Sequence, residues 1–345
     1  MRDRYYIFMI ITGIAILSGW MFAYSTVHPD DAFAYSSNIA RPQKLSLSAE
    51  ANMLTSATKK QVLGARAEAA SSTTITVSAD LDPIRINGSD EFTTSASSAV
   101  LINEKTGSAL WDKNADDLRA IASITKLFTA LVFLDFNPGW EKVYQMKNTD
   151  RREGGKVYLW SGEKVSVKDL FYLSLVASGN SETMALVNST GLGEELFVKK
   201  MNEKAKALGL RKTVFLDPVG LNEGNVSTAR EVAKFAHEAL KNDEIVKAVT
   251  LDKYKCATKA NRNVSVNSTD ELLGDKKVTD LSLRGGKTGF NEKAGYCFVG
   301  RFSNEENHPI ISVILGEATK KSRFSETMNL VNWAYANHAW PEKLN

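Results

Sequence analysis

The residues Ser123-Ile124-Thr125-Lys126 place a hydroxyl and an amine at a spacing that suits nucleophilic catalysis. At the start of a helix, positions i and i+3 share one face, so the lysine amine reaches the serine hydroxyl. The apolar residues that follow recur at helical spacing, which predicts a buried helix over residues 123–136. Because burial lowers the pKa of a lysine, Lys126 is a candidate general base for Ser123.

The same spacing of serine and lysine occurs twice more in the chain. Ser56 is followed by Lys59, and Ser161 is followed by Lys164. Neither copy stands at the head of an apolar helix, and a solvated pair explains each of them. The copy that begins at Ser123 is therefore the candidate nucleophile.

A second motif, Ser178-Gly179-Asn180, separates two apolar stretches. Glycine and asparagine are common helix caps, so punctuation between two helices would explain the motif by itself. In a catalytic interpretation, Ser178 relays a proton and Asn180 directs its amide at a substrate carbonyl. Both interpretations remain open at this point.

The third motif, Lys287-Thr288-Gly289, lies inside an apolar strand-like run and follows two glycines. A lysine is unusual in a buried strand, and glycine permits close approach of a ligand to the backbone. A second Lys-Thr-Gly, at residues 105–107, is best explained as a hairpin turn. The motif at 287 is therefore the candidate for substrate binding.

The elements that would position these motifs follow one another from residue 97 to the C-terminus. The pattern predicts an α/β sandwich of the α+β type, with an antiparallel five-stranded sheet flanked by helices. The first and last segments should lie side by side, and Thr228 with Glu231 predicts a capping box. The expected strands are 99–103, 109–112, 282–290, 295–302 and 310–315, and the expected helices are 123–136, 167–177, 181–188, 195–208, 228–241 and 325–338.

The N-terminal region has a different composition. Residues 5–27 carry no charge and would span roughly 34 Å as a helix, enough to cross a bilayer. We therefore expect residues 1–34 to hold a short cytoplasmic end and a retained transmembrane anchor, with the rest of the chain outside the cytoplasmic membrane. A signal peptide cleaved after Ala34 is the alternative. Residues 35–96, rich in Ser, Thr and Ala, predict a tether to a domain over 97–345.

Composition excludes several classes of protein. The net charge of +3 is too small for a protein that binds nucleic acid through its phosphates. The four histidines and two cysteines show no ligand spacing, so neither a metal nor another cofactor is expected. Cys256 lies in a polar stretch and Cys297 in an apolar one, and we expect them not to form a disulfide.

The three motifs occur in the order known from β-lactamases and penicillin-binding proteins. Beyond the motifs, the chain resembles the low-molecular-mass D-alanyl-D-alanine carboxypeptidases over nearly all of the predicted domain. The resemblance rests on four stretches, INEKTGSALWDKNADDLRAIASITKLFTALVFLD, FVKKMNEKAKALGLRKTVFLDPVGLNEGNVSTAREVA, GGKTGFNEKAGYCFVG and ISVILGEATKKSRFSETMNLVNWAY.

This resemblance implies a serine acyl-transfer hydrolase that trims the terminal D-Ala from peptidoglycan stem peptides and is inhibited by β-lactam antibiotics. Ser123 would attack the carbonyl, Lys126 would accept its proton, and Ser178 with Lys287 would relay a proton to the leaving amine. The implied substrate-binding residues are Asn180, Lys287, Thr288, Gly289 and Phe290. The N–H groups of Ser123 and Phe290 would form the oxyanion hole.

Two short segments depart from the pattern of that family. Arg284-Gly285-Gly286 stands where Asp-Gly-Ile or Asp-Gly-Leu is common, and Ser268-Thr269-Asp270 stands where Asn-Thr-Asn or Asn-Arg-Asn is usual. A D,D-endopeptidase that cuts peptidoglycan cross-links would share every motif. An inactive, membrane-tethered penicillin-binding sensor is a further alternative, and a class A β-lactamase is less favoured.

Overall fold

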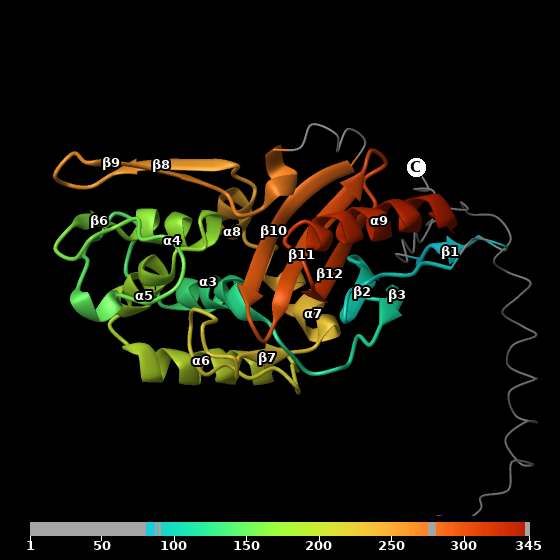
Figure 1. Cartoon of the computed structure of the whole chain (residues 1–345), viewed down its shortest axis with the longest axis horizontal. Coiled ribbons are helices and arrows are strands. Elements are labelled where there is room, and N and C mark those ends of the chain that lie inside the picture. The colour runs from blue at the N-terminus through green and yellow to red at the C-terminus, as the bar shows by residue number, and fades with distance from the viewer. Residues whose placement is uncertain (1–80, 87, 89–90, 275–280, 342–345) are drawn as a thin grey trace, which may run out of the picture. The chain divides into compact units, whose positions relative to one another are not determined.

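The computed structural model describes residues 81–86, 88, 91–274 and 281–341. Its centre is an antiparallel sheet of five strands in the order β10-β11-β12-β2-β3 (Figure 1). Strand β12 pairs with β2, so the first and last segments of the domain lie side by side, as predicted. The strands are β2 (Ser98–Asn103), β3 (Ala109–Lys113), β10 (Leu281–Asn291), β11 (Gly295–Asn304) and β12 (Pro309–Glu317).

Helices cover both faces of this sheet. Helix α9 (Ser322–Asn337) packs on β11 and β12, and α7 (Ala229–Ala239) packs on β12 and β2 from the other side (Figure 1). Along β2, alternate side chains point to opposite faces. Leu101 joins the core under α9, whereas Val100 joins the larger core shared with the helices. The predicted α+β sandwich is therefore confirmed.

The remaining helices form a layer beside the sheet, with α3 (Thr125–Asp135) at its centre. Eight of the eleven residues of α3 are buried, because it packs against helices on several sides. Its main neighbours besides α7 are α4 (Val167–Val176) and α6 (Glu194–Ala207). The predicted helix over 181–188 is α5 (Asn180–Ser189), which packs against α4.

Several short elements were not predicted from the sequence. They are α8 (Asp243–Val249), the two-stranded pairs β4 (Arg119–Ala120) with β7 (Val226–Ser227), β5 (Val143–Gln145) with β6 (Lys164–Ser166), and β8 (Lys253–Ala257) with β9 (Asn263–Asn267), and the 3-10 turns η1 (Ala122–Ile124), η2 (Asn148–Asp150) and η3 (Glu271–Gly274). Most of these are too short for a periodic pattern to emerge.

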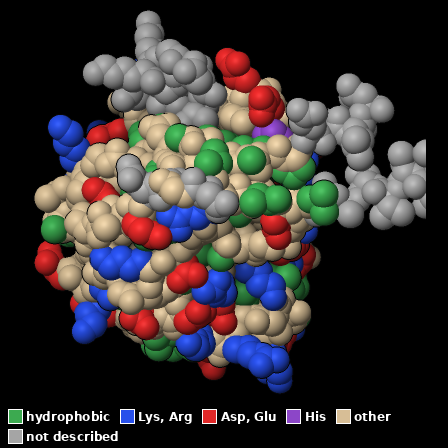
Figure 2. Space-filling model, turned by 90° about the vertical axis from the view of Figure 1, so that its right-hand side faces the viewer, with side chains coloured by type: hydrophobic (Ala, Val, Ile, Leu, Met, Phe, Trp, Pro, Cys, Tyr) green, Lys and Arg blue, Asp and Glu red, His purple; other side chains and the backbone are tan. Residues whose placement is uncertain are grey.

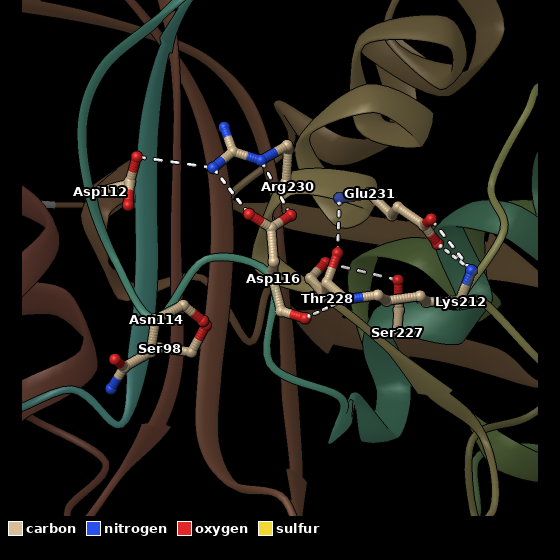
Figure 3. Close-up of polar contacts among 9 residues, drawn as sticks. All are labelled: Ser98, Asp112, Asn114, Asp116, Lys212, Ser227, Thr228, Arg230 and Glu231. Atoms are coloured by element: carbon tan, nitrogen blue, oxygen red, sulfur yellow. Dashed lines mark hydrogen bonds and ion pairs between the residues drawn. The ribbon is translucent and has the colours of Figure 1, made fainter.

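The N-terminus of α7 shows a half-formed capping box (Figure 3). Thr228 Oγ1 accepts from the N–H of Glu231 at 3.1 Å, as predicted. The Glu231 carboxylate does not accept a hydrogen bond from the Thr228 N–H. It accepts instead from the N–H of Lys212 at 3.0 Å and from the Thr213 hydroxyl. The reciprocal bond is lost because the loop before β7 supplies closer donors.

Part of the predicted tether packs on the domain. Strand β1 (Ile84–Arg85) pairs with β13 (His338–Ala339), and Asn103 Nδ2 donates to Asp82 at 3.0 Å. The ring of Phe92 meets that of Trp111 edge-on at 5.1 Å. A boundary at residue 97 therefore lies too late in the chain, because these contacts join the preceding segment to the domain.

The predicted anchor and the earlier part of the tether lie outside the described residues. Within the part of the chain that is described, no helix is both long and apolar enough to cross a membrane. On the face shown in Figure 2, acidic and basic side chains are interspersed. Cys256 in β8 and Cys297 in β11 are both free thiols.

Candidate active site

The hydroxyl of Ser123 and the amine of Lys126 lie together at the start of α3. Ser123 stands in η1, and Lys126 Nζ lies 2.8 Å from its Oγ. Nζ also donates to Asn180 Oδ1 at 2.8 Å and to the Val219 carbonyl at 2.7 Å. The Lys126 side chain is fully buried, and this burial lowers its pKa to about 7, while the nearby carboxylates of Asp217 and Glu182 partly oppose the shift. A neutral amine is thus accessible near neutral pH.

The loop before β7 supplies the carbonyl of Val219 that accepts from Lys126. Asp217 Oδ1 accepts from the N–H groups of Val219 and Gly220, which turns the Val219 carbonyl toward Lys126. A Cβ on Gly220 would overlap the carbonyl oxygen of Ala122, which precedes Ser123 in η1. A glycine is therefore required where the loop meets the turn that carries the serine.

A second pair of hydroxyl and amine faces the first. Lys287 Nζ donates to Ser178 Oγ at 2.9 Å and to the Thr288 carbonyl at 3.1 Å. Ser178 has a positive φ of 56° in the connection between α4 and α5, a strained conformation for this residue. Burial, followed by the charges of Lys126 and Arg323, holds the pKa of Lys287 well below its usual value. The structure thus brings the three sequence motifs together.

Asn180 differs from its expected role. Its Nδ2 donates to the carbonyls of Glu153 at 3.1 Å and Gly154 at 2.8 Å. Both amide hydrogens are therefore used within the chain, and Oδ1 is the atom that faces Lys126. The expectation that this amide points at a substrate carbonyl does not fit this arrangement.

Strand β10 brings the third motif against the turn that carries the serine. A Cβ on Gly289 would lie 2.7 Å from the carbonyl oxygen of Ile121, so only glycine allows this approach. The Thr288 hydroxyl lies 2.7 Å from the hydroxyl of Thr269. The ring of Phe290 is half exposed and stacks on Tyr296 at 4.2 Å.

Sequence reasoning missed Arg323, a basic residue of α9 that is 4% exposed. Its Nη1 donates to the Gly289 carbonyl at 3.3 Å, and its guanidinium lies over the ring of Tyr296. Burial lowers the pKa of Arg323. The sequence carries no signal for it, because two lysines precede it closely and Glu326 follows. Arg323 adds positive potential behind β10.

The two segments that depart from the family pattern, residues 284–286 and 268–270, pack on each other. Asp270 is buried, and a Cβ on Gly286 would lie 2.9 Å from its Oδ2. That oxygen has no hydrogen-bond partner among the described residues. Burial raises the pKa of Asp270 to about 7. The glycine in one segment therefore accommodates the carboxyl in the other.

The other copies of the motifs lie apart from this cluster. Ser161 stands in a turn and Lys164 in β6, and both are exposed. Ser56 and Lys59 lie outside the described residues. In the described part of the chain, no group of three or more His, Cys, Asp or Glu side chains is placed to hold a metal ion.

Comparison with known proteins decides the family. The family described as D-alanyl-D-alanine carboxypeptidase, which consists of serine peptidases, matches residues 86–319. The chain belongs to this family. Its match to the family includes all three motifs and the turn that carries Ser123.

Relatives in this carboxypeptidase family carry more than one activity in their names. The chain is 32% identical to D-alanyl-D-alanine carboxypeptidase DacF of Bacillus subtilis, over 70% of this chain and 63% of DacF. It is 31% identical to a D-alanyl-D-alanine endopeptidase of Pseudomonas aeruginosa, over 68% of this chain and 76% of that protein. The crystal structure of the Streptomyces K15 DD-transpeptidase is similar with a TM-score of 0.66 and 28% identity, and the match covers 72% of this chain and 99% of that one.

Proposed function

We propose that this protein is a serine-type D-alanyl-D-alanine carboxypeptidase that trims the terminal D-Ala from peptidoglycan stem peptides. The observation that carries the proposal is the contact of 2.8 Å between Ser123 Oγ and the amine of Lys126. Burial lowers the pKa of this amine to about 7. A buried amine of this kind accepts the serine proton without a histidine.

Acylation begins when Ser123 Oγ attacks the carbonyl carbon of the peptide bond between the two D-Ala residues. The hydroxyl proton passes to the neutral amine of Lys126. The N–H groups of Ser123 and Phe290 stabilise the oxyanion, and each such donor contributes roughly 3–4 kcal/mol in comparable reactions. The close packing of Gly289 on Ile121 supports this assignment, because it brings the two backbone segments together.

The carbon–nitrogen bond then breaks and the leaving amine takes up a proton through Ser178 and Lys287, which are 2.9 Å apart. The Thr288 hydroxyl, the Lys287 amine as a hydrogen-bond donor and the positive charge of Arg323 suit the terminal carboxylate of the substrate. Water hydrolyses the acyl-enzyme and regenerates Ser123. A β-lactam would acylate the same serine, and the resulting acyl-enzyme would be hydrolysed slowly.

The endopeptidase named among the relatives gives a second candidate function. It uses the same acylation step, but the leaving amine belongs to the second stem peptide of a cross-link, so that stem peptide is released in place of free D-Ala. The space beyond the leaving group decides between the two activities.

The proposal includes a place for the enzyme in the cell. The uncharged run over residues 5–27 supports a single-pass anchor in the cytoplasmic membrane. The domain would then act on the peptidoglycan outside that membrane. Carbonate washing of membranes tests the anchor, which should stay with the lipid, whereas a mature N-terminus at Tyr35 would contradict it.

The activity is tested by incubating the full chain with diacetyl-Lys-D-Ala-D-Ala and with a purified cross-linked muropeptide dimer. Release of free D-Ala from the tripeptide supports the carboxypeptidase. Cleavage of the dimer alone supports the endopeptidase. Acylation by penicillin without turnover of either substrate would contradict both and support the sensor.

A further inference from the structure

The segment of residues 151–160 is fastened to the first turn of α5. Arg152 donates its N–H to Ser181 Oγ at 3.1 Å. The carbonyls of Glu153 and Gly154 accept from Asn180 Nδ2. One end of the segment therefore holds the amide whose oxygen accepts from Lys126.

The other end of the segment is held by Glu182, which is 0% exposed. Its Oε1 accepts from the N–H of Leu159 at 3.0 Å and from the N–H of Tyr158 at 3.2 Å. Its Oε2 is buried without a hydrogen-bond partner among the described residues, and a Cβ on Gly179 would overlap it. Burial of a carboxyl group with an unmatched oxygen destabilises a fold, so its presence calls for a compensating role.

The orientation of the Asn180 amide depends on this segment. An amide has one acceptor end and one donor end. Because Glu153 and Gly154 present carbonyls to Nδ2, only Oδ1 can face Lys126. A shift of the segment would free the amide to rotate, and Lys126 would lose one of its three acceptors.

We propose that Glu182 is a positioning residue for the acylation of Ser123. By holding Tyr158 and Leu159, it keeps the 151–160 segment on α5 and thereby keeps the oxygen of Asn180 on Lys126. Glu182 does not touch the substrate. This inference rests on the proposed function of the site, because it concerns the same acylation step.

Three substitutions of Glu182 distinguish the position of its acceptor oxygen from its negative charge. Glu182→Gln keeps an oxygen acceptor at the same distance and removes the charge. Glu182→Asp keeps the charge and withdraws the acceptor by one methylene. Glu182→Ala removes both. Glu163→Gln is the matched control, because Glu163 accepts from the Trp160 N–H at 2.7 Å and from Arg262 at 2.6 Å within the same region, and no hydrogen bond joins it to α5 in the described part of the chain.

The measurement is the rate of acylation of the full chain by a fluorescent penicillin between pH 5 and 9, with thermal unfolding of each variant alongside. At pH 9, where Lys126 is neutral, we expect Glu182→Asp and Glu182→Ala to slow acylation at least tenfold, and Glu182→Gln and Glu163→Gln to stay within threefold of the wild type. In Glu182→Asp the acidic limb of the profile should move to lower pH, because the ammonium form of Lys126 loses the Asn180 oxygen. In Glu182→Gln the limb should also move to lower pH, because the ammonium form loses one of its two nearby carboxylates and keeps only that of Asp217, but the rate at pH 9 should not fall.

Three outcomes would overturn the proposal. They are wild-type rates in Glu182→Asp, equal slowing in Glu182→Gln and Glu182→Asp, and equal slowing in Glu163→Gln. If Glu182→Ala does not fold, the comparison of the Asp and Gln variants still decides. A wild-type chain that penicillin does not acylate would instead refute the proposed function, and the positioning role with it.

Discussion

The chain contains Lys-Thr-Gly in two regions, and the fold gives the same three residues opposite surroundings. In β10, Lys287 is 1% exposed and donates to Ser178, and Gly289 lies against the turn of Ser123. In the turn between β2 and β3, Lys105 is exposed and the Gly107 N–H closes the turn on the Asn103 carbonyl at 2.8 Å.

The second copy also borders a cavity of about 560 Å³ between the β2–β3 turn and α7. The acids around that cavity are paired. Asp116 accepts from the Arg230 guanidinium, and Glu231 accepts from the N–H of Lys212 (Figure 3). Neither Ser123 nor Ser178 lines this cavity. Burial beside a nucleophile therefore distinguishes a reactive lysine from a structural turn.

The most severe test replaces the nucleophile. Ser123→Ala should abolish covalent labelling by penicillin, because no other hydroxyl among the described residues is hydrogen-bonded to the Lys126 amine. Ser161→Ala, in the exposed copy of the motif, should label like the wild type. Gel fluorescence after labelling measures both. Labelling that persists in Ser123→Ala would refute the assignment.

The two Lys-Thr-Gly copies give the next largest effect. Lys287→Ala should lower the acylation rate by about 10²–10³-fold, in the range found when a preorganised polar group is removed from an acyl-transfer site. Lys105→Ala should change it less than twofold. Stopped-flow acylation kinetics compare them, and similar losses in both variants would break the distinction between the two regions.

The pH dependence of acylation tests the buried amine. Lys126 must be neutral to accept a proton, and its pKa is about 7. The neutral fraction therefore falls as pH falls, and the rate should drop about tenfold for each pH unit well below 7. A profile with its acidic limb near pH 10, as for an exposed lysine, would contradict the role of burial.

The smallest effect concerns the segment before β2. A chain that begins at residue 97 should be less stable than one that begins at residue 81 by about 1–3 kcal/mol. Full burial of a phenylalanine contributes about 1.5–3 kcal/mol, Phe92 is partly buried, and the shorter chain also loses the pairing of β1 with β13. Phe92→Ala in the longer chain should reproduce most of the loss. Urea unfolding measures both, and equal midpoints would mean that this segment adds no stability.

Much of the fold follows from the sequence because its long elements have strong periodic patterns. The five main strands and six of the helices were predicted within a few residues. The pairs β5–β6 and β8–β9 were missed because their strands have only three to five residues, too few for the alternation seen in β9 to stand out in the sequence. The role of Phe92 was missed for a related reason, since its partner Trp111 lies in a strand that the sequence does not link to it.

The sequence by itself determined the chemistry available to this protein, since the order of the three motifs identifies the proposed nucleophile and both lysines. Only the tertiary structure decided which copies of those motifs meet, how deeply the lysines are buried, and which end of the Asn180 amide faces Lys126. Arg323, Asp270 and Glu182 belong to the same category. Their effects depend on contacts between distant segments and on the loss of water around a charge, and neither is encoded in the spacing of residues along the chain.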